Sequence, residues 1–206
     1  MTSLSLGFGL GFFVAAQLGP ISLLAIRSTL RSGAAIGLAI GAAVAIVDTL
    51  YAAAGAAGAA GLLSLEPLRL AFGLIGAAVL VALGARTLWS AFRVRMGGEA
   101  LEEVATPRSA FLTALAATAS NPLTIASWAA IFAAASTAGA TGTSGATALL
   151  LLGVGIGSLT WMTILATGVS LARRRIGDRT LQAVDTVAGL GIAGFGIVLG
   201  YRTLQE

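Results

Sequence analysis

Long segments of this sequence carry almost no charged side chain, and they limit what the chain can fold into. Hydrophobic residues make up 57% of the chain and charged residues only 10%, whereas a soluble domain carries about a quarter charged residues. A helix needs about 20 apolar residues to cross the hydrocarbon core of a bilayer. We therefore predict an all-α integral membrane protein, one domain over residues 1–206, with six transmembrane helices at 4–26, 34–63, 68–92, 110–136, 146–172 and 181–201.

Two of these segments are interrupted by a proline dipeptide at matching places. Gly19-Pro20 lies inside the first segment and Asn121-Pro122 inside the fourth. Proline removes a backbone donor and clashes with the carbonyl four residues earlier, and in lipid the freed groups need partners in protein or in a water-filled cavity. Broken helices at corresponding positions of two halves point to the substrate site of a transporter. Proline kinks that merely bend the two helices are the alternative.

The sequence also indicates an internal repeat, with halves at about 1–95 and 108–206. The first span of each half carries the proline break, and the second carries a Gly-x-x-x-Gly pair, Gly37/Gly41 and Gly153/Gly157. Glycine pairs are common wherever membrane helices pack closely, so one pair alone indicates little. With three spans in each half, consecutive repeats insert in opposite orientations. We therefore predict two inverted three-helix repeats.

The distribution of arginine sets the expected orientation. Every basic residue of the chain is arginine, and most lie in the loops between spans one and two, three and four, and five and six. Positive residues in short loops stay cytoplasmic, so both termini are predicted outside. A five-span or re-entrant arrangement, in which the broken segments do not cross fully, is the alternative. The arginines form no basic face, so the lipid bilayer and not nucleic acid is the expected partner.

Missing residue types narrow the chemistry further. The chain has no Cys and no His, which excludes disulfides and thiolate metal sites and removes the commonest general base and neutral metal ligand. We expect no cofactor and no bound metal, and we do not expect an enzyme.

Asp48 is the residue that most strongly suggests a function. It lies near the middle of the second span, with no other charge between Arg31 and Glu66. A carboxylate at bilayer depth costs at least about 2.5 kcal/mol and marks a functional site by default. Its helical neighbours at steps of three and four share one face, and they are small: Gly37, Gly41, Ala45, Ala52 and Gly55. A buried acid that only holds the bundle together is the structural alternative.

Polar residues beside the breaks complete a candidate substrate site. Asn121 suits an N-cap and Pro122 the first position of a new half-helix, and Gly19-Pro20 is interpreted in the same way. Helix N-termini of this kind bind anions such as a substrate carboxylate. Tyr51, one turn beyond Asp48, has a hydroxyl that can donate to the carboxylate. Further candidates for the substrate site are Gln17, Ser22, Ser120, Thr124 and Trp161.

An ordered set of motifs covers nearly the whole chain. The first half has Leu18-Gly19-Pro20, Arg27, Gly33, Gly37, Gly41 and Asp48-x-x-Tyr51, and the second has Phe111, Asn121-Pro122, Gly153 to Trp161, an Arg-rich loop, and Asp185-x-x-x-Gly189 leading to Gly196. This set resembles the LysE/RhtB family of bacterial amino-acid exporters. One departure is Val47, where the family usually has glycine before the acid.

The resemblance implies a small secondary transporter of the bacterial cytoplasmic membrane that exports amino acids or related metabolites with the proton or ion gradient. A homo-oligomer is a candidate assembly. Asp48 is then the proton or ammonium site, and the two broken helices hold the carboxylate of a zwitterionic amino acid. An exporter of metal cations or other small ions is an alternative, although one acid without His or Cys makes a poor transition-metal site. An intramembrane hydrolase with Asp48 and Asp185 as an aspartyl pair is a third candidate.

Overall fold

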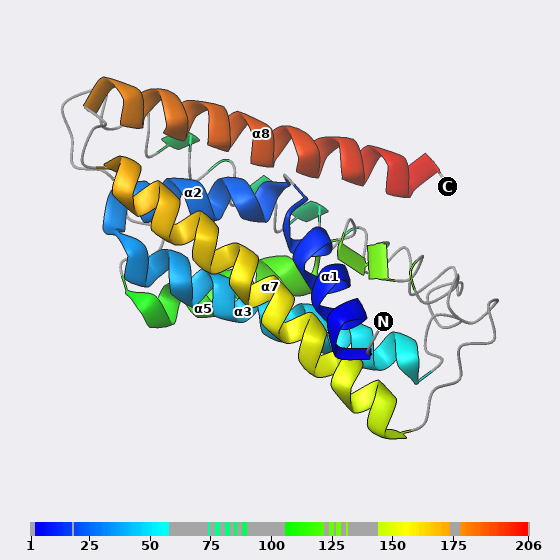
Figure 1. Ribbon diagram of the computed structural model, residues 1–206. Helices are drawn as coiled ribbons and strands as arrows, with labels where there is room; N and C mark the ends of the chain where they lie inside the picture. Colours follow the sequence, from blue (N-terminus) through cyan, green and yellow to red (C-terminus); the bar gives the residue numbers. More distant parts are fainter. Residues whose placement is uncertain are drawn as a thin grey trace.

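The computed structural model describes residues 3–17, 19–57, 106–121, 144–173 and 178–205, together with single residues within 74–89 and 124–131 (Figure 1). Every regular element in this part of the chain is helical, as predicted. The helices are α1 (Ser3–Ala15), α2 (Pro20–Ser32), α3 (Ala34–Ala56), α5 (Pro107–Ala119), α7 (Ser144–Arg173) and α8 (Asp178–Gln205). The predicted third span and Pro122 lie outside these ranges, as do most residues of the fourth span beyond Asn121.

The first apolar segment forms two helices of 13 residues each, α1 and α2, whose axes differ in direction by 77°. Gly19 is the extended N-cap of α2 and Pro20 its first residue, where a proline costs no backbone hydrogen bond. At about 1.5 Å per residue, neither helix alone covers a hydrocarbon core of about 30 Å. The predicted span 4–26 ends too early, because α2 continues to Ser32 through Arg27, whose side chain is only 2% exposed.

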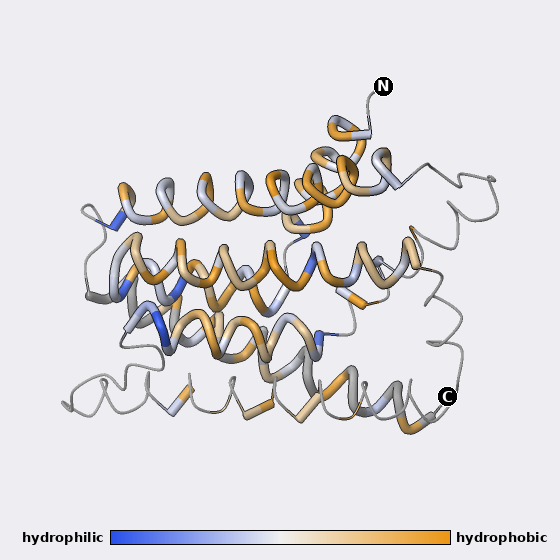
Figure 2. Tube along the Cα trace, turned by 90° about the horizontal axis from the view of Figure 1, so that it is seen from below, coloured by the Kyte–Doolittle hydropathy of each residue, from blue (hydrophilic) through white to orange (hydrophobic). Residues whose placement is uncertain are grey.

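Gly33 joins α2 directly to α3. Its φ of 94° lies in a region that side-chain-bearing residues avoid, which explains a glycine at this one-residue connection. The helix α3, with 23 residues, and α7, with 30, are each long and apolar enough to cross a membrane, and α1 with α2 provides a third crossing if the bent pair is one span. Figure 2 shows hydrophobic colouring over most of the length of these helices.

Glycines bring α1 and α7 into backbone contact. A Cβ built on Gly7 would lie 2.0 Å from the carbonyl oxygen of Leu150, and one on Gly11 would lie 2.1 Å from that of Val154. From the other side, Gly153 and Gly157 meet the backbone of α1 in the same way. Residue numbers rise together along this contact, so α1 and α7 run parallel. Only glycine allows helices to approach so closely.

The helix α3 is the centre of the bundle and runs antiparallel to α7. Gly37 of α3 lies against Ala166 of α7, and Gly41 against Met162. Most of the buried apolar residues come from α2, α3 and α5, and α8 packs along α2 (Figure 1). The outer face of α7 carries large exposed apolar side chains: Leu149, Leu152, Ile156, Leu159, Ile164 and Leu171. An apolar exterior around buried polar groups is the arrangement expected in lipid.

Candidate functional site

Asp48 lies in the middle of α3 with its side chain 1% exposed. The predicted small face of α3 is confirmed at Gly37, Gly41, Ala45 and Ala52, which are all buried, while Gly55 near the helix end is half-buried. Small residues here allow neighbouring helices to surround the acid. The carboxyl group is therefore enclosed by protein and is kept away from the exposed apolar surface.

Two donors from the second half of the chain bind the carboxylate. The indole Nε1 of Trp128 donates to Oδ1 at 3.0 Å, and the Ser158 hydroxyl of α7 lies 2.7 Å from Oδ2. Trp128 and Ser158 are themselves 2% and 0% exposed. Hydrogen bonds to an ionised group are stronger than those between neutral groups. The two halves of the chain thus meet at this acid, through residues that sequence analysis did not assign to the site.

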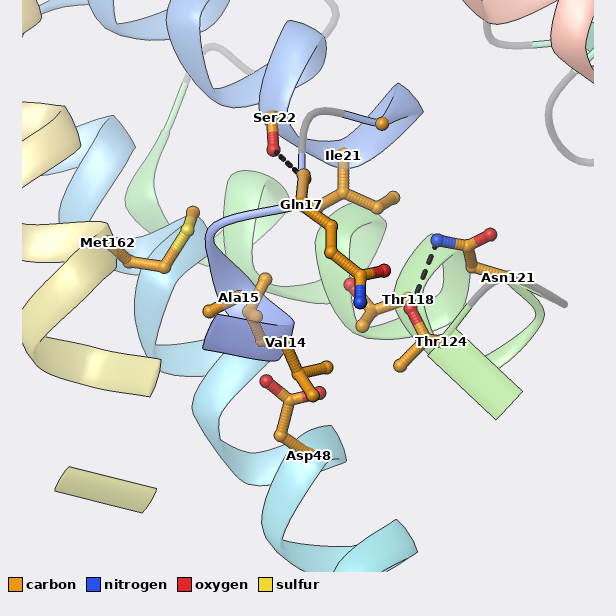
Figure 3. Close-up of a pocket in the computed structure, with 12 residues that line it drawn as sticks. Val14, Ala15, Gln17, Ile21, Ser22, Asp48, Thr118, Asn121, Thr124 and Met162 are labelled. Atoms are coloured by element: carbon orange, nitrogen blue, oxygen red, sulfur yellow. Dashed lines mark hydrogen bonds between the residues drawn. The ribbon is translucent and has the colours of Figure 1, made fainter. Parts of the chain in front are cut away.

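Asp48 also forms part of the wall of a cavity of about 40 Å³ (Figure 3). The wall comes from the end of α1, the residues that join it to α2, the first turn of α2, the middle of α3, the end of α5 and one residue of α7. The lining residues are Val14, Ala15, Gln17, Gly19, Ile21, Ser22, Val44, Asp48, Thr118, Asn121, Thr124 and Met162. A single water needs about 10–15 Å³ of such space, so this cavity has room for only a few waters.

The N-terminus of α2 opens onto this cavity. Gly19 provides no side-chain cap. The two residues that follow Pro20 line the wall of the cavity, and they are Ile21 and Ser22. The first N–H groups of a helix have no partner within the helix, and the helix dipole favours an anion at this end. The hydroxyl of Ser22 is engaged elsewhere, because it donates to the carbonyl oxygen of Gln17 at 3.0 Å.

Thr118 supplies an unused polar group to the same cavity. Its side chain is 2% exposed, and its hydroxyl has no hydrogen-bond partner among the described residues. Neighbouring polar side chains are paired: Asn121 Nδ2 donates to Thr124 Oγ1 at 3.0 Å, and Ser127 Oγ donates to Gln17 Oε1 at 3.2 Å. A buried hydroxyl without a partner costs free energy, which a ligand in the cavity can recover.

The structure brings together most of the residues predicted for the site. Those that line the cavity are Gln17, Gly19, Ser22, Asp48, Asn121 and Thr124. Pro20 is buried at the start of α2, whereas Ser120 donates its hydroxyl to carbonyls of its own helix. Pro122 and the Asp185 side chain lie outside the part of the molecule described, so the aspartyl pair has no geometry to assess.

Two predicted residues have other contacts. The hydroxyl of Tyr51 donates to the carbonyl of Ala119, so the expected donation to the Asp48 carboxylate is wrong in this structure. Ala119 is the last residue of α5, and its carbonyl has no partner within that helix. Trp161 is not among the cavity-lining residues and packs edge-on against Phe12, with ring centres 5.3 Å apart. Its indole nitrogen is buried and has no acceptor among the described residues.

A sequence signal was available for only some of the residues that were missed. Ser158 directly follows Gly157 of the glycine pair, so its place in a helix contact was open to prediction. No local sequence pattern indicates that Trp128 donates a hydrogen bond to Asp48. Across the described residues, no three His, Cys, Asp or Glu side chains are grouped as a metal site requires.

Comparison with known families gives one match. The family model described as LysE type translocator matches residues 12–203. Neither the curated proteins nor the solved structures contain a match. The matched range includes the break at Gly19-Pro20, Asp48, and both of the groups that donate to it.

Proposed function

The chain belongs to the LysE type translocator family, and from this membership and the site we propose that it exports amino acids or related small metabolites across the bacterial cytoplasmic membrane. Export is secondary transport, coupled to the proton or ion gradient. The observation that carries the proposal is Asp48, a buried carboxyl group in the middle of an apolar helix that forms part of the wall of a cavity lined by both polar and apolar side chains. An acid at this depth is costly and is expected to serve transport.

The chemistry of the cavity favours a zwitterionic substrate. Among the described residues that line the cavity, Asp48 is the acidic one and none is basic. A substrate ammonium group fits beside Asp48. A substrate carboxylate fits at the N-terminus of α2, where Ile21 and Ser22 present backbone N–H groups and Thr118 offers its unpaired hydroxyl. The second half-helix, beginning at Pro122, contributes an equivalent end in this proposal.

Substrate binding requires the cavity to enlarge. Its present volume of about 40 Å³ suits a few waters. The break between α1 and α2 is the natural place for movement, because residues at helix ends absorb changes in backbone angle. We infer a closed conformation here and a wider one that admits substrate from the cytoplasmic side.

Helix directions support the proposed inverted repeat. The helices α3 and α7 correspond to the second spans of the two halves, and they run antiparallel. Two repeats inserted in opposite orientations require this relation. The outward termini remain part of the proposal, because they follow from the arginine distribution alone.

The test compares export by the wild-type protein and by Asp48→Asn, which keeps the shape of the side chain but cannot titrate. Untargeted comparison of metabolites released by cells with and without the protein first identifies the substrate. We expect Asp48→Asn to insert normally and to lose gradient-driven export. Thr49→Val is the matched control, because within the part of the chain described the Thr49 hydroxyl bonds only to the carbonyl of Ala45 in its own helix. Wild-type export by Asp48→Asn at every pH would show that the acid is structural.

A further inference from the structure

Ser158 lies between two hydrogen-bond acceptors that belong to different helices. Its Oγ is 2.7 Å from Oδ2 of Asp48 in α3 and 3.1 Å from the carbonyl oxygen of Gly11 in α1. The side chain is fully buried at 0% exposure. A serine hydroxyl has one hydrogen and two lone pairs, so it donates to only one of these acceptors at a time.

The protonation state of Asp48 decides which acceptor receives that hydrogen. When Asp48 is ionised, its carboxylate is the stronger acceptor and takes the hydrogen bond. When Asp48 carries a proton on Oδ2, this proton is donated to Ser158 Oγ, and the serine hydrogen turns to Gly11. Serine keeps its own proton throughout, and Trp128 Nε1 donates to Oδ1 in both states. Every group is satisfied in each state without displacement of a heavy atom.

We propose that Ser158 is a positioning residue that relays the protonation of Asp48 to α1. The relay deepens the proposed function and rests on it, because it takes Asp48 as the group that gains and loses the transported proton. In the protonated state a hydrogen bond joins α7 to α1 at Gly11. In the ionised state this bond is absent, and the two helices are held by their other contacts, which include the glycine contacts and the packing of Trp161 against Phe12.

The position of Gly11 explains how the signal reaches the cavity. Gly11 lies one helical turn before Ala15, where α1 ends. The cavity is lined by residues that follow Gly11 closely in the sequence, namely Val14, Ala15 and Gln17. A bond made or lost at Gly11 therefore changes how firmly the wall beside the substrate is held. The hydroxyl is thus placed to couple proton binding to the shape of the cavity.

Few other titratable groups lie on the helices around Asp48. Helix α1 carries none, and the hydroxyl of Tyr51, on α3 itself, is bound to Ala119. Arg173 ends α7, about 22 Å along the helix from Ser158. Arg108 lies in the first turn of α5, at the opposite end from Ala119, and α2 carries Arg27 and Arg31. Within the described residues, Asp48 is therefore the group whose titration the relay reports.

The test measures the α1–α7 distance and the titration of Asp48 separately in the full-length protein in lipid nanodiscs. The chain has no native cysteine, so spin labels are placed through Phe13→Cys in α1 and Leu171→Cys in α7, at side chains 73% and 71% exposed. Infrared spectroscopy follows the carboxylic C=O band that Asp48→Asn abolishes. We expect the distance distribution of the wild type to be narrow at low pH and broader once this band disappears.

The variants separate the relay from a merely structural contact. Ser158→Ala should still show the titrating band, but its distance distribution should be broad at every pH. Asp48→Asn, whose amide donates to Ser158 as a protonated carboxyl does, should be narrow at every pH, and Ser158→Thr should restore the response. Thr160→Val is the matched control, because among the described residues the exposed Thr160 hydroxyl bonds only to the carbonyl of Ile156 in its own helix. This variant should respond as the wild type does.

Two results would overturn the relay: a wild-type distance that ignores the titration of Asp48, or a wild-type pH response in Ser158→Ala. The first result is obtained without any variant at Ser158, so poor folding of Ser158→Ala leaves the proposal testable. Neither readout uses substrate. Failure to export amino acids is therefore distinguishable from failure of the relay.

Discussion

Replacing Gly11 by alanine tests whether backbone contact between α1 and α7 holds the site together. The added Cβ would lie 2.1 Å from the carbonyl oxygen of Val154, about 1.3 Å short of the 3.4 Å at which ordinary contact begins. The obstacle is backbone, so no side-chain rotation relieves it and the helices must separate. Overpacking of this kind costs about 1–3 kcal/mol, occasionally more. The separation also lengthens the hydrogen-bond distance from Ser158 to Gly11, now 3.1 Å.

Gly9 provides the matched control for this change, because a Cβ built there meets nothing within 4 Å. Both substitutions gain the same helix propensity, about 1 kcal/mol in water, so this gain cancels in the comparison. We expect Gly11→Ala to be less stable than Gly9→Ala by about 1–3 kcal/mol, measured by reversible unfolding in mixed micelles, and to export more slowly. Equal stability of the two variants would refute the close approach of α1 and α7.

Three further predictions concern two side chains near the site and the orientation of the chain. Thr118→Val should fold at least as stably as the wild type, because an unpaired buried polar group costs about 1–3 kcal/mol. The same variant should raise the KM of export, and an unchanged KM would show that Thr118 is not part of the substrate site. Trp128→Phe should slow export about tenfold or more, because it deletes a charge-assisted hydrogen bond of about 1.5–3 kcal/mol. Trp161→Phe is the control and should change the rate little, because the indole N–H that it removes has no acceptor among the described residues. Equal export rates in the two variants would show that Trp128 does not contribute to the function of Asp48. A single cysteine within 137–145 should react with an impermeant reagent from outside and one at Gly97 should not; the reverse pattern would invert the predicted orientation.

Local sequence was sufficient to predict where α3 begins and which of its faces carries Asp48, but the predicted span 34–63 runs past Ala56, where the helix ends. A charge-free segment starting at residue 34 and a spacing of small residues at three and four gave both the start of the helix, at Ala34, and the face that carries Asp48. These features depend only on the period of the helix. The end of the first segment was predicted less well, because the predicted span stops at residue 26, directly before Arg27. The structure buries Arg27 within α2, and a buried arginine does not stop a helix.

The partners of Asp48 were beyond local sequence analysis. Trp128 is separated from Asp48 by 80 residues and Ser158 by 110, and neither periodicity nor motif spacing specifies which residues meet over such separations. Tyr51 illustrates the same limit, because its position relative to Asp48 was clear but its competing acceptor on α5 was not. Helix periodicity predicts a face of α3, whereas packing of the second half against that face determines the chemistry.

The number of donors around Asp48 has a consequence for transport. Placing a carboxylate at this depth costs at least about 2.5 kcal/mol, and each charge-assisted hydrogen bond returns about 1.5–3 kcal/mol. With the two bonds from Trp128 and Ser158, cost and gain are of similar size, so neither protonation state is strongly excluded. A fuller set of donors would hold the group permanently charged, and an apolar surrounding would hold it permanently neutral. A proton carrier needs access to both states, and a two-donor site with a serine that adapts to either one satisfies that requirement.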